Sequence, residues 1–384
     1  MKHGTHILAA ILLILAPTAL AAGKQPVQDA AQTEPATEQT LSPKMQALAD
    51  KVRRALAEYQ ARRLNTRDHG PWQIMHSTIG QGIGAKVLAG GPSGEPVTAI
   101  GWLCFNRPAY DQRLFFLSGD GLAARTGPGL QGHEAQMLAV LAQTGVKPDY
   151  PMRVSGRDFT VADLVEYEKA TCMAGTELTY KLIGLSHYLP PGASWKNELG
   201  ETWDVERLIR EELGQPINGA TCGGSHRLMG LSYALHRRAE RGQPMTGEFA
   251  RARKYIDEYL EYALALQNTD GSFSTDYFVS RASEKDDLAR LETTGHLLEW
   301  IVFALPADSL EQPRVVKSVD YLARLLLRTK GADPSAGVLG HAVRGLMIYE
   351  RRVFGDRSAP PATRQDVAKQ ASRSTPTRAP MLAP

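Results

Sequence analysis

The sequence predicts an all-α fold, an (α/α)6 toroid built from six helical hairpins. Six short stretches that carry a His, a Glu or a Cys run directly into apolar segments of helical period. These stretches lie roughly 40 to 70 residues apart, about the length of a two-helix hairpin with its loops. Amphipathic segments alternate with the apolar ones, as the outer and inner helices of a toroid do.

The six apolar segments are expected to be inner helices that run in one direction and bring their N-termini together. Their predicted starts lie near residues 75, 133, 175, 224, 294 and 340. Outer helices with one polar face are predicted over residues 42–62, 160–170, 202–213, 248–267 and 310–328. Residues 97–105 and 113–118 have the β-branched and aromatic density of short strands, which predicts a small inserted β-hairpin.

The N-terminus predicts export to the periplasm or the cell exterior. Residues 1–21 have a basic start, an apolar run over 7–15 and small residues before a cleavage point after Ala21, the pattern of a secretory signal peptide. The apolar run is short for a bilayer span, so no stable membrane insertion is expected after cleavage. A retained membrane anchor is the alternative.

Composition divides the rest of the chain. Residues 22–41 are rich in Ala, Gln, Pro, Thr and Glu and are expected to form a flexible linker. Residues 356–384, rich in Pro, Ser, Ala and Arg, are expected to form a disordered tail. The toroid domain then spans residues 42–355. The formal net charge of +3 is nearly balanced, so no nucleic-acid groove is expected.

One segment resembles a known repeat. Residues 262–273 read Tyr-Ala-Leu-Ala-Leu-Gln-Asn-Thr-Asp-Gly-Ser-Phe. This is similar to the Gln-x-x-x-Gly-x-Trp or Phe repeat of the squalene cyclase and prenyltransferase superfamily of α/α toroids. We expect Gly271 to take a positive φ and Asp270 to accept backbone N–H groups of the turn. Gln267 is expected to hold a neighbouring helix end, with Phe273 stacked on it.

The prenyltransferase and lanthionine-cyclase types of this superfamily hold zinc on Cys and His at successive inner-helix N-termini. The resemblance places such ligands at Cys222, His226 and His296. Zinc favours thiolate and imidazole ligands, but the carboxylate that those enzymes carry just before the Cys is absent here. Cys172 and Cys222 occupy equivalent points of neighbouring repeats, so a disulfide, buried free thiols and a zinc site all stay open.

A second resemblance points to sugar chemistry. Residues 295–300, Gly-His-Leu-Leu-Glu-Trp, resemble a stretch of the N-acylglucosamine 2-epimerase and mannose isomerase families, which are also (α/α)6 barrels with an acid/base His. A His at a helix N-terminus has its pKa lowered by the helix dipole and stays neutral, as a base or ligand must. The predicted catalytic residues are His133, Glu134, Glu177, His226, His296 and Glu299. The predicted binding residues are His76, Trp72 and His341.

Three function classes stay open. The first is an exported enzyme acting on a sugar or polysaccharide, of lyase, epimerase or hydrolase type. The second is a non-catalytic envelope binding scaffold, in which each His only caps or packs its own helix. The third is a zinc-dependent or isoprenoid-type toroid enzyme, although terpene cyclisation is disfavoured because the Asp-x-Asp-Asp motif is missing. Zinc is the one cofactor suggested, and a small molecule or glycan is the expected ligand.

Overall fold

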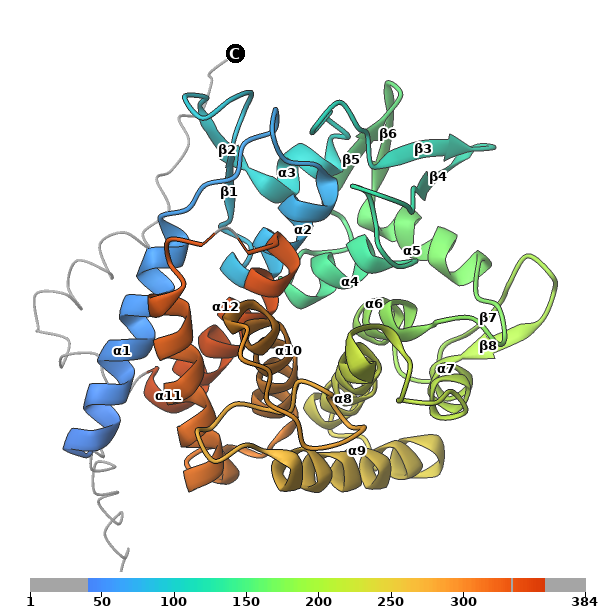
Figure 1. Ribbon diagram of the computed structural model, residues 1–384. Helices are drawn as coiled ribbons and strands as arrows, with labels where there is room; N and C mark the ends of the chain where they lie inside the picture. Colours follow the sequence, from blue (N-terminus) through green and yellow to red (C-terminus); the bar gives the residue numbers. More distant parts are fainter. Residues whose placement is uncertain (1–40, 333, 356–384) are drawn as a thin grey trace, which may run out of the picture. The chain divides into compact units, whose positions relative to one another are not determined.

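The protein is mostly α-helical in its computed structural model, which describes residues 41–332 and 334–355. Within these residues, twelve α-helices are combined with four two-stranded antiparallel sheets, so the fold is helix-rich but not all-α (Figure 1). The expected signal peptide, the tail and nearly all of the linker fall on residues outside this description. No helix of the described ranges has both the length and the apolarity that a membrane span requires.

Six helices correspond to the predicted inner segments. They are α2 (Pro71–Gln81), α4 (Gln136–Gln143), α6 (Thr179–Tyr188), α8 (Ser225–Glu240), α10 (Asp287–Ala304) and α12 (Ala336–Tyr349). Each helix of this series contacts the next one, and α12 contacts α2. Five starts lie close to the predicted ones, but α10 begins at Asp287 and not near residue 294. The reason is a cap, because the Asp286 side chain accepts the Leu288 N–H at 3.0 Å.

The remaining helices are α1 (Pro43–Gln60), α3 (Ala99–Cys104), α5 (Val161–Ala170), α7 (Val205–Leu213), α9 (Gly247–Leu266) and α11 (Pro313–Arg328). All of these except α3 lie where the sequence predicts outer helices. Short helical turns of other types occupy Thr221–Gly224, Ala307–Ser309 and Glu350–Phe354. Local chemistry sets the boundaries: α1 starts after Ser42, whose side chain accepts the Met45 N–H at 3.3 Å, with Pro43 at the first helical position.

The strands form four local hairpins, and the predicted hairpin between residues 97–105 and 113–118 is wrong. The pairs are β1 (Lys86–Leu88) with β2 (Pro96–Thr98), β3 (Phe115–Ser118) with β4 (Gly121–Ala124), β5 (Pro151–Val154) with β6 (Arg157–Thr160), and β7 (Ser194–Lys196) with β8 (Thr202–Asp204). The segment after Thr98 turns into helix α3. Its buried residues Ala99, Ile100, Leu103 and Cys104 recur with helical and not strand spacing.

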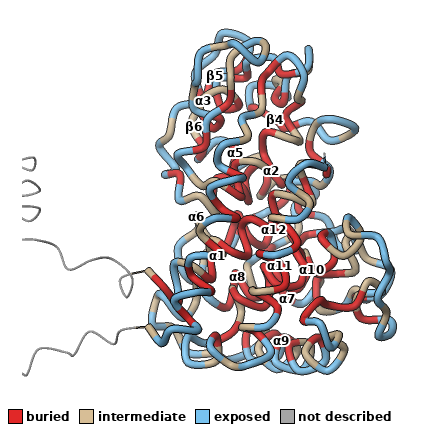
Figure 2. Tube along the Cα trace, turned by 60° about the vertical axis from the view of Figure 1, so that its left-hand side comes forward, coloured by how far each residue is buried: buried red, intermediate tan, exposed pale blue. Residues whose placement is uncertain are grey.

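Buried residues concentrate along the inner helices, as Figure 2 shows for α8, α10 and α12. Glycines let two of these helices touch through their backbones. A Cβ atom on Gly340 of α12 would lie 2.4 Å from the carbonyl oxygen of His76 in α2, and one on Gly80 would lie 3.1 Å from the Gly340 oxygen. No larger residue fits at Gly340 without moving a helix, so α2 and α12 are held in close contact.

The turn that follows α9 has the local geometry that the sequence predicts. Gly271 has φ of 101°, and Asp270 Oδ1 accepts the Ser272 N–H at 3.0 Å. Gln267 Nε2 donates to the Arg314 carbonyl in the first turn of α11 at 3.0 Å. The positive φ and the helix-end contact are therefore confirmed, while the resemblance of the repeat to the cyclase superfamily stays a prediction.

Candidate functional site

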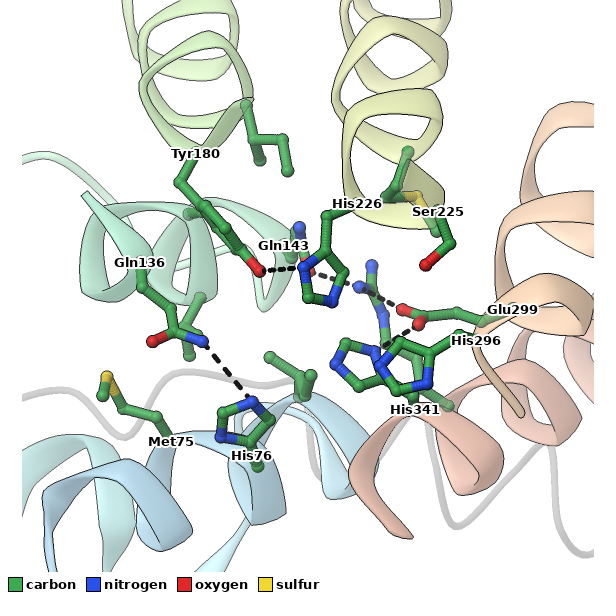
Figure 3. A pocket seen from close by; sticks show the side chains of 16 residues that line it. Met75, His76, Gln136, Gln143, Tyr180, Ser225, His226, His296, Glu299 and His341 are labelled. Carbon is green, nitrogen blue, oxygen red and sulfur yellow. Dashed lines mark hydrogen bonds and ion pairs between the residues drawn. The ribbon is translucent and has the colours of Figure 1, made fainter. Parts of the chain in front are cut away.

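Five histidines that are far apart in the sequence lie together between the inner helices. The ring centroid of His226 lies 5.3 Å from those of His133 and His296 and 5.2 Å from that of His341. The His76 ring lies 5.6 Å from the His341 ring. Figure 3 shows the rings of His76, His226, His296 and His341 around one space, which they reach from α2, α8, α10 and α12.

The space between these rings is a cavity of about 30 Å³. Its other polar lining residues are Gln136, Gln143, Tyr180, Ser225, Glu299 and Arg344. A water molecule takes up roughly 30 Å³ in the liquid, but a cavity volume of about 10–15 Å³, measured with a water-sized sphere, is enough to hold one. The cavity therefore has room for an ion with a water molecule, whereas a sugar ring does not fit between the side chains as they stand.

One ring nitrogen of each histidine is held by a neighbouring group. In His76 and His296, Nδ1 contacts a backbone carbonyl oxygen of the same helix, that of Trp72 at 2.7 Å and that of Glu292 at 2.8 Å. In His133 and His341 it contacts a carboxylate, Glu177 Oε2 at 2.7 Å and Glu299 Oε2 at 2.5 Å. In His226 it contacts the Tyr180 hydroxyl at 3.0 Å. A carbonyl or carboxylate on Nδ1 fixes the proton there and leaves the Nε2 lone pair available. This is how metal-binding histidines are usually oriented.

The Nε2 atoms of these histidines differ in their hydrogen-bond partners. Nε2 of His226 is buried and has no hydrogen-bond partner among the described residues. His76 is different, because its Nε2 faces the Gln136 amide nitrogen at 3.4 Å, and that amide is oriented by accepting the Gly132 N–H at 2.9 Å. Both nitrogens of His76 are therefore satisfied by the protein, whereas His226 retains an unused buried nitrogen that a ligand would satisfy.

A left-handed turn presents Cys222 to this cluster. Cys222, Gly223 and Gly224 have φ values of 50°, 60° and 81°, directly before α8 begins. Positive φ is costly for a residue with a Cβ, so the surrounding structure must hold Cys222 in this conformation. The Sγ of Cys222 and one ring nitrogen each of His226 and His296 lie within 4.8 Å of one another. The structure thus brings together the three residues predicted as metal ligands.

Burial keeps the imidazoles of His76, His226 and His296 neutral. It lowers the pKa of His76 and of His296 to about 3 and that of His226 well below its usual value. Burial also raises the pKa of the Cys222 thiol to about 12. At neutral pH the rings therefore offer lone pairs, while the thiol keeps its proton until a metal displaces it.

Burial, and not a helix N-terminus, is the largest cause of the lowered pKa values of His76 and His296. His226 is the second residue of α8, but His76 and His341 lie in the second turns of α2 and α12, and His296 lies in the third turn of α10. The dipole acts mainly within the first turn of a helix. His133 precedes α4 altogether.

Glu299 is buried and faces His341 and Arg344. Its Oε1 accepts a hydrogen bond from Nη1 of Arg344 at 2.8 Å, while its Oε2 meets His341. Burial alone would raise the pKa of Glu299, but the charge of Arg344 and the contact with His341 lower it. Glu299 was predicted to be catalytic. In the structure its carboxylate positions two other side chains of the cavity.

The other predicted residues divide into two groups. Glu177 joins the cluster through its 2.7 Å contact with His133, and the two side chains are 37% and 12% exposed. Glu134 does not join it, because its carboxylate is directed to Lys181, at 3.8 Å, beside a separate cavity. Trp72 is not an open stacking surface: its ring lies 4.2 Å from the His76 ring and packs against Gly337 of α12.

Sequence reasoning missed Tyr180, Gln136 and Arg344. Arg344 had a usable signal, because it is the only charged residue in α12 and lies three positions after His341, on the same helical face. Tyr180 and Gln136 had no such signal. Cys104, Cys172 and Cys222 are free thiols, and Cys172 donates to the Glu168 carbonyl at 3.3 Å, so the disulfide alternative is not the arrangement found.

Comparison with known proteins assigns neither a family nor a function to the chain. No protein-family model matches the chain, and no curated protein or solved structure is significantly similar to it. The chemistry of the described side chains is therefore the basis for a functional proposal.

Proposed function

We propose that the protein is an exported metal-dependent enzyme whose centre is formed by Cys222, His226 and His296. One observation carries the proposal: a thiol and two imidazole nitrogens lie within 4.8 Å of one another beside a small buried cavity. The unpartnered Nε2 of His226 supports it independently, because a buried polar atom without a partner is costly. Zinc is the metal that this mixed donor set favours.

The donor set fits a zinc ion of ordinary geometry. Bond lengths of about 2.3 Å to sulfur and 2.0–2.1 Å to nitrogen place tetrahedral ligand atoms about 3.5 Å apart. The three atoms lie within 4.8 Å of one another, so zinc binding would draw them closer together. Three protein ligands leave a fourth position open, as in catalytic and not structural zinc sites. A metal bound there would lower the pKa of a coordinated water molecule.

The remaining cavity residues would serve that chemistry. The ring of His341 lies 4.1 Å from the ring of His296, and Glu299 holds its Nδ1 so that Nε2 is the free nitrogen. We assign His341 the role of accepting a proton from a water molecule or substrate in the cavity. Glu299 and Arg344 orient this base and do not react themselves.

For the substrate we propose a sugar or polysaccharide, with the His133–Glu177 pair as its contact point. The pair belongs to the cluster through the 5.3 Å approach of the His133 and His226 rings, yet Glu177 is 37% exposed. A substrate too large for the 30 Å³ cavity could still reach this pair. The sugar class rests on the resemblance of residues 295–300 to the epimerase and isomerase families. The 2.7 Å contact of an imidazole with a carboxylate supports acid/base chemistry at this pair.

We further propose that the six inner helices close into the (α/α)6 toroid that the sequence predicts. The serial contacts from α2 to α12, and the contact of α12 with α2, support this closure. Export rests on the sequence pattern of residues 1–21 alone. N-terminal sequencing of the secreted protein tests it, since the expected mature chain begins after Ala21.

The metal proposal is tested by metal analysis of the purified protein before and after treatment with EDTA and zinc. The parent is expected to bind one zinc ion, and Cys222→Ser and His296→Asn are expected to lose it. His236→Asn is the matched control, because His236 is an exposed residue of α8 that pairs with Glu240. A parent that binds no zinc, or variants that bind as well as the parent, would reject the proposal.

The substrate proposal needs a separate measurement. A glycan-array screen of the zinc-loaded protein is expected to give binding that His133→Asn abolishes and His236→Asn does not. If zinc binds but no glycan does, the metal centre stands and the sugar class fails. If neither binds, the envelope scaffold becomes the better account of the fold.

A further inference from the structure

We propose a second binding site, for a small organic anion with an apolar body, on the other face of helix α2. A cavity of about 360 Å³ lies between the C-terminal end of α1, α2 and α12. It is far larger than the cavity at the histidine cluster and falls within the 300–1,000 Å³ usual for ligand pockets. It shares the helices α2 and α12 with the histidine cavity but none of its lining residues.

Two helix faces build this second cavity. Gln73, Ser77 and Gln81 follow one another at helical spacing along α2, while His76, between them in sequence, faces the histidine cluster. Leu339 and Val343 are likewise one helical turn apart on α12, and both line this cavity. The remaining wall comes from the end of α1 and the loop that follows it.

The polar side chains of this cavity offer mainly donors. Oε1 of Gln73 already accepts the Gly70 N–H at 2.7 Å, and Oγ of Ser77 accepts from Gln81 at 3.1 Å. Oγ of Ser335 likewise accepts from the backbone of α12. Because these acceptors are used within the protein, the amide N–H groups of Gln73 and the hydroxyl protons remain for a ligand.

The charge of the cavity is positive. Arg62 and Arg63 line it, and no Asp or Glu is among its described lining residues. Arg62 donates to the Lys330 carbonyl, but Arg63 forms no ion pair with any described residue. A guanidinium group is always charged and suits a carboxylate, sulfonate or phosphate.

The apolar wall defines the other half of the ligand. It is formed by Leu64, Pro334, Ala336, Leu339 and Val343. A bare inorganic anion would leave this wall in contact with water, whereas an aliphatic or aromatic body would cover it. The chemistry therefore points to an amphipathic anion such as a medium-chain carboxylate.

The test uses 1-anilinonaphthalene-8-sulfonate as a fluorescent probe on the full chain. We expect saturable binding that Arg63→Ala weakens about tenfold or more, the size of a lost charge-assisted hydrogen bond. Arg54→Ala is the matched control, because Arg54 is an exposed residue of α1, the helix that precedes Arg63, and it lies outside the cavity. It removes the same charge and should change binding by less than about twofold.

Competition and cavity filling complete the test. Decanoate should displace the probe, whereas inorganic phosphate at the same concentration should not. Ser77→Phe should fill the cavity and abolish binding, with melting temperature as the check on folding. The proposal fails if no saturable binding occurs, if the two Arg variants behave alike, or if phosphate competes as well as decanoate. Cys222→Ser should leave probe binding unchanged, which separates this site from the metal centre.

Discussion

Nδ1 of His341 lies 2.5 Å from Oε2 of Glu299, and both residues are buried. The second oxygen of the same carboxylate meets Arg344 at 2.8 Å. One side chain of α10 therefore fixes two side chains of α12. The contact joins neighbouring inner helices and determines which nitrogen of His341 faces the cavity.

Replacing Glu299 should be costly. Glu299→Ala leaves the buried Arg344 charge without its partner, so we expect a loss of about 3–5 kcal/mol in the free energy of unfolding. Glu299→Gln keeps the shape and should lose less. Urea denaturation measures both, with Glu258→Gln, an exposed residue of α9, as a control expected within about 0.5 kcal/mol of the parent. A Glu299→Ala variant as stable as that control would contradict this account.

Stability should fall in mild acid. His76, His226 and His296 have lowered pKa values in the folded protein, against about 6.5 in the unfolded chain. Below pH 6.5 the unfolded chain takes up protons that these buried rings do not. The contribution of these three rings to the free energy of unfolding is therefore fully present above that pH, and it is lost as the pH falls from about 6.5 towards 3.

Each of these histidines removes at most about 1.4 kcal/mol per pH unit within that window. Urea denaturation in EDTA at pH 7.5, 6.5 and 5.5 measures the effect without bound metal. Equal stability at pH 7.5 and 5.5 would show that the rings are accessible to protons in the folded state.

The turn that carries Cys222 depends on Gly223. A Cβ at this position would lie 2.0 Å from Cγ of Tyr277, and φ is 60°. Gly223→Ala should therefore displace the turn, lower stability by more than about 1–2 kcal/mol and weaken zinc binding. Gly219→Ala is the matched control, because Gly219 has φ of 84° but open space around its Cβ. Equal zinc binding by the two variants would mean that the turn does not place the thiol.

The backbone contact of α2 and α12 gives another prediction. Gly340→Ala forces a methyl group against the His76 carbonyl, so we expect a loss of about 1–3 kcal/mol, the usual cost of overpacking. Gly84→Ala, in a loop with open space around it, should be neutral or slightly stabilising. Thermal unfolding distinguishes the two. A neutral Gly340→Ala would indicate that the helices separate easily.

Much of the helical architecture could be predicted because its causes are local. Apolar periodicity, the cap at Ser42 and the turn at Gly271 are all properties of short segments. Where the prediction missed, a local cause was overlooked. Asp286 starts α10 early and so moves His296 from the helix end into its third turn.

The site was only partly predictable, because the direction in which a side chain points depends on tertiary packing. Repeated positions in the hairpins indicated that the five histidines converge. Yet the adjacent residues His133 and Glu134 point in different directions, just before Ala135 takes a left-handed φ of 61°. His133 contacts Glu177 and the His226 ring, while Glu134 lines a separate cavity. Tyr180 reaches His226 across the space between α6 and α8. Neither fact follows from residue spacing.

The touching glycines of α2 and α12 have a mechanical consequence. No side chain lies between Gly80 and the Gly340 backbone, so we expect a displacement of one helix to be passed directly to the other. His76 and His341 lie on one face of this helix pair, and the walls of the larger cavity lie on its other face. We therefore expect a molecule bound in the larger cavity to shift both rings together.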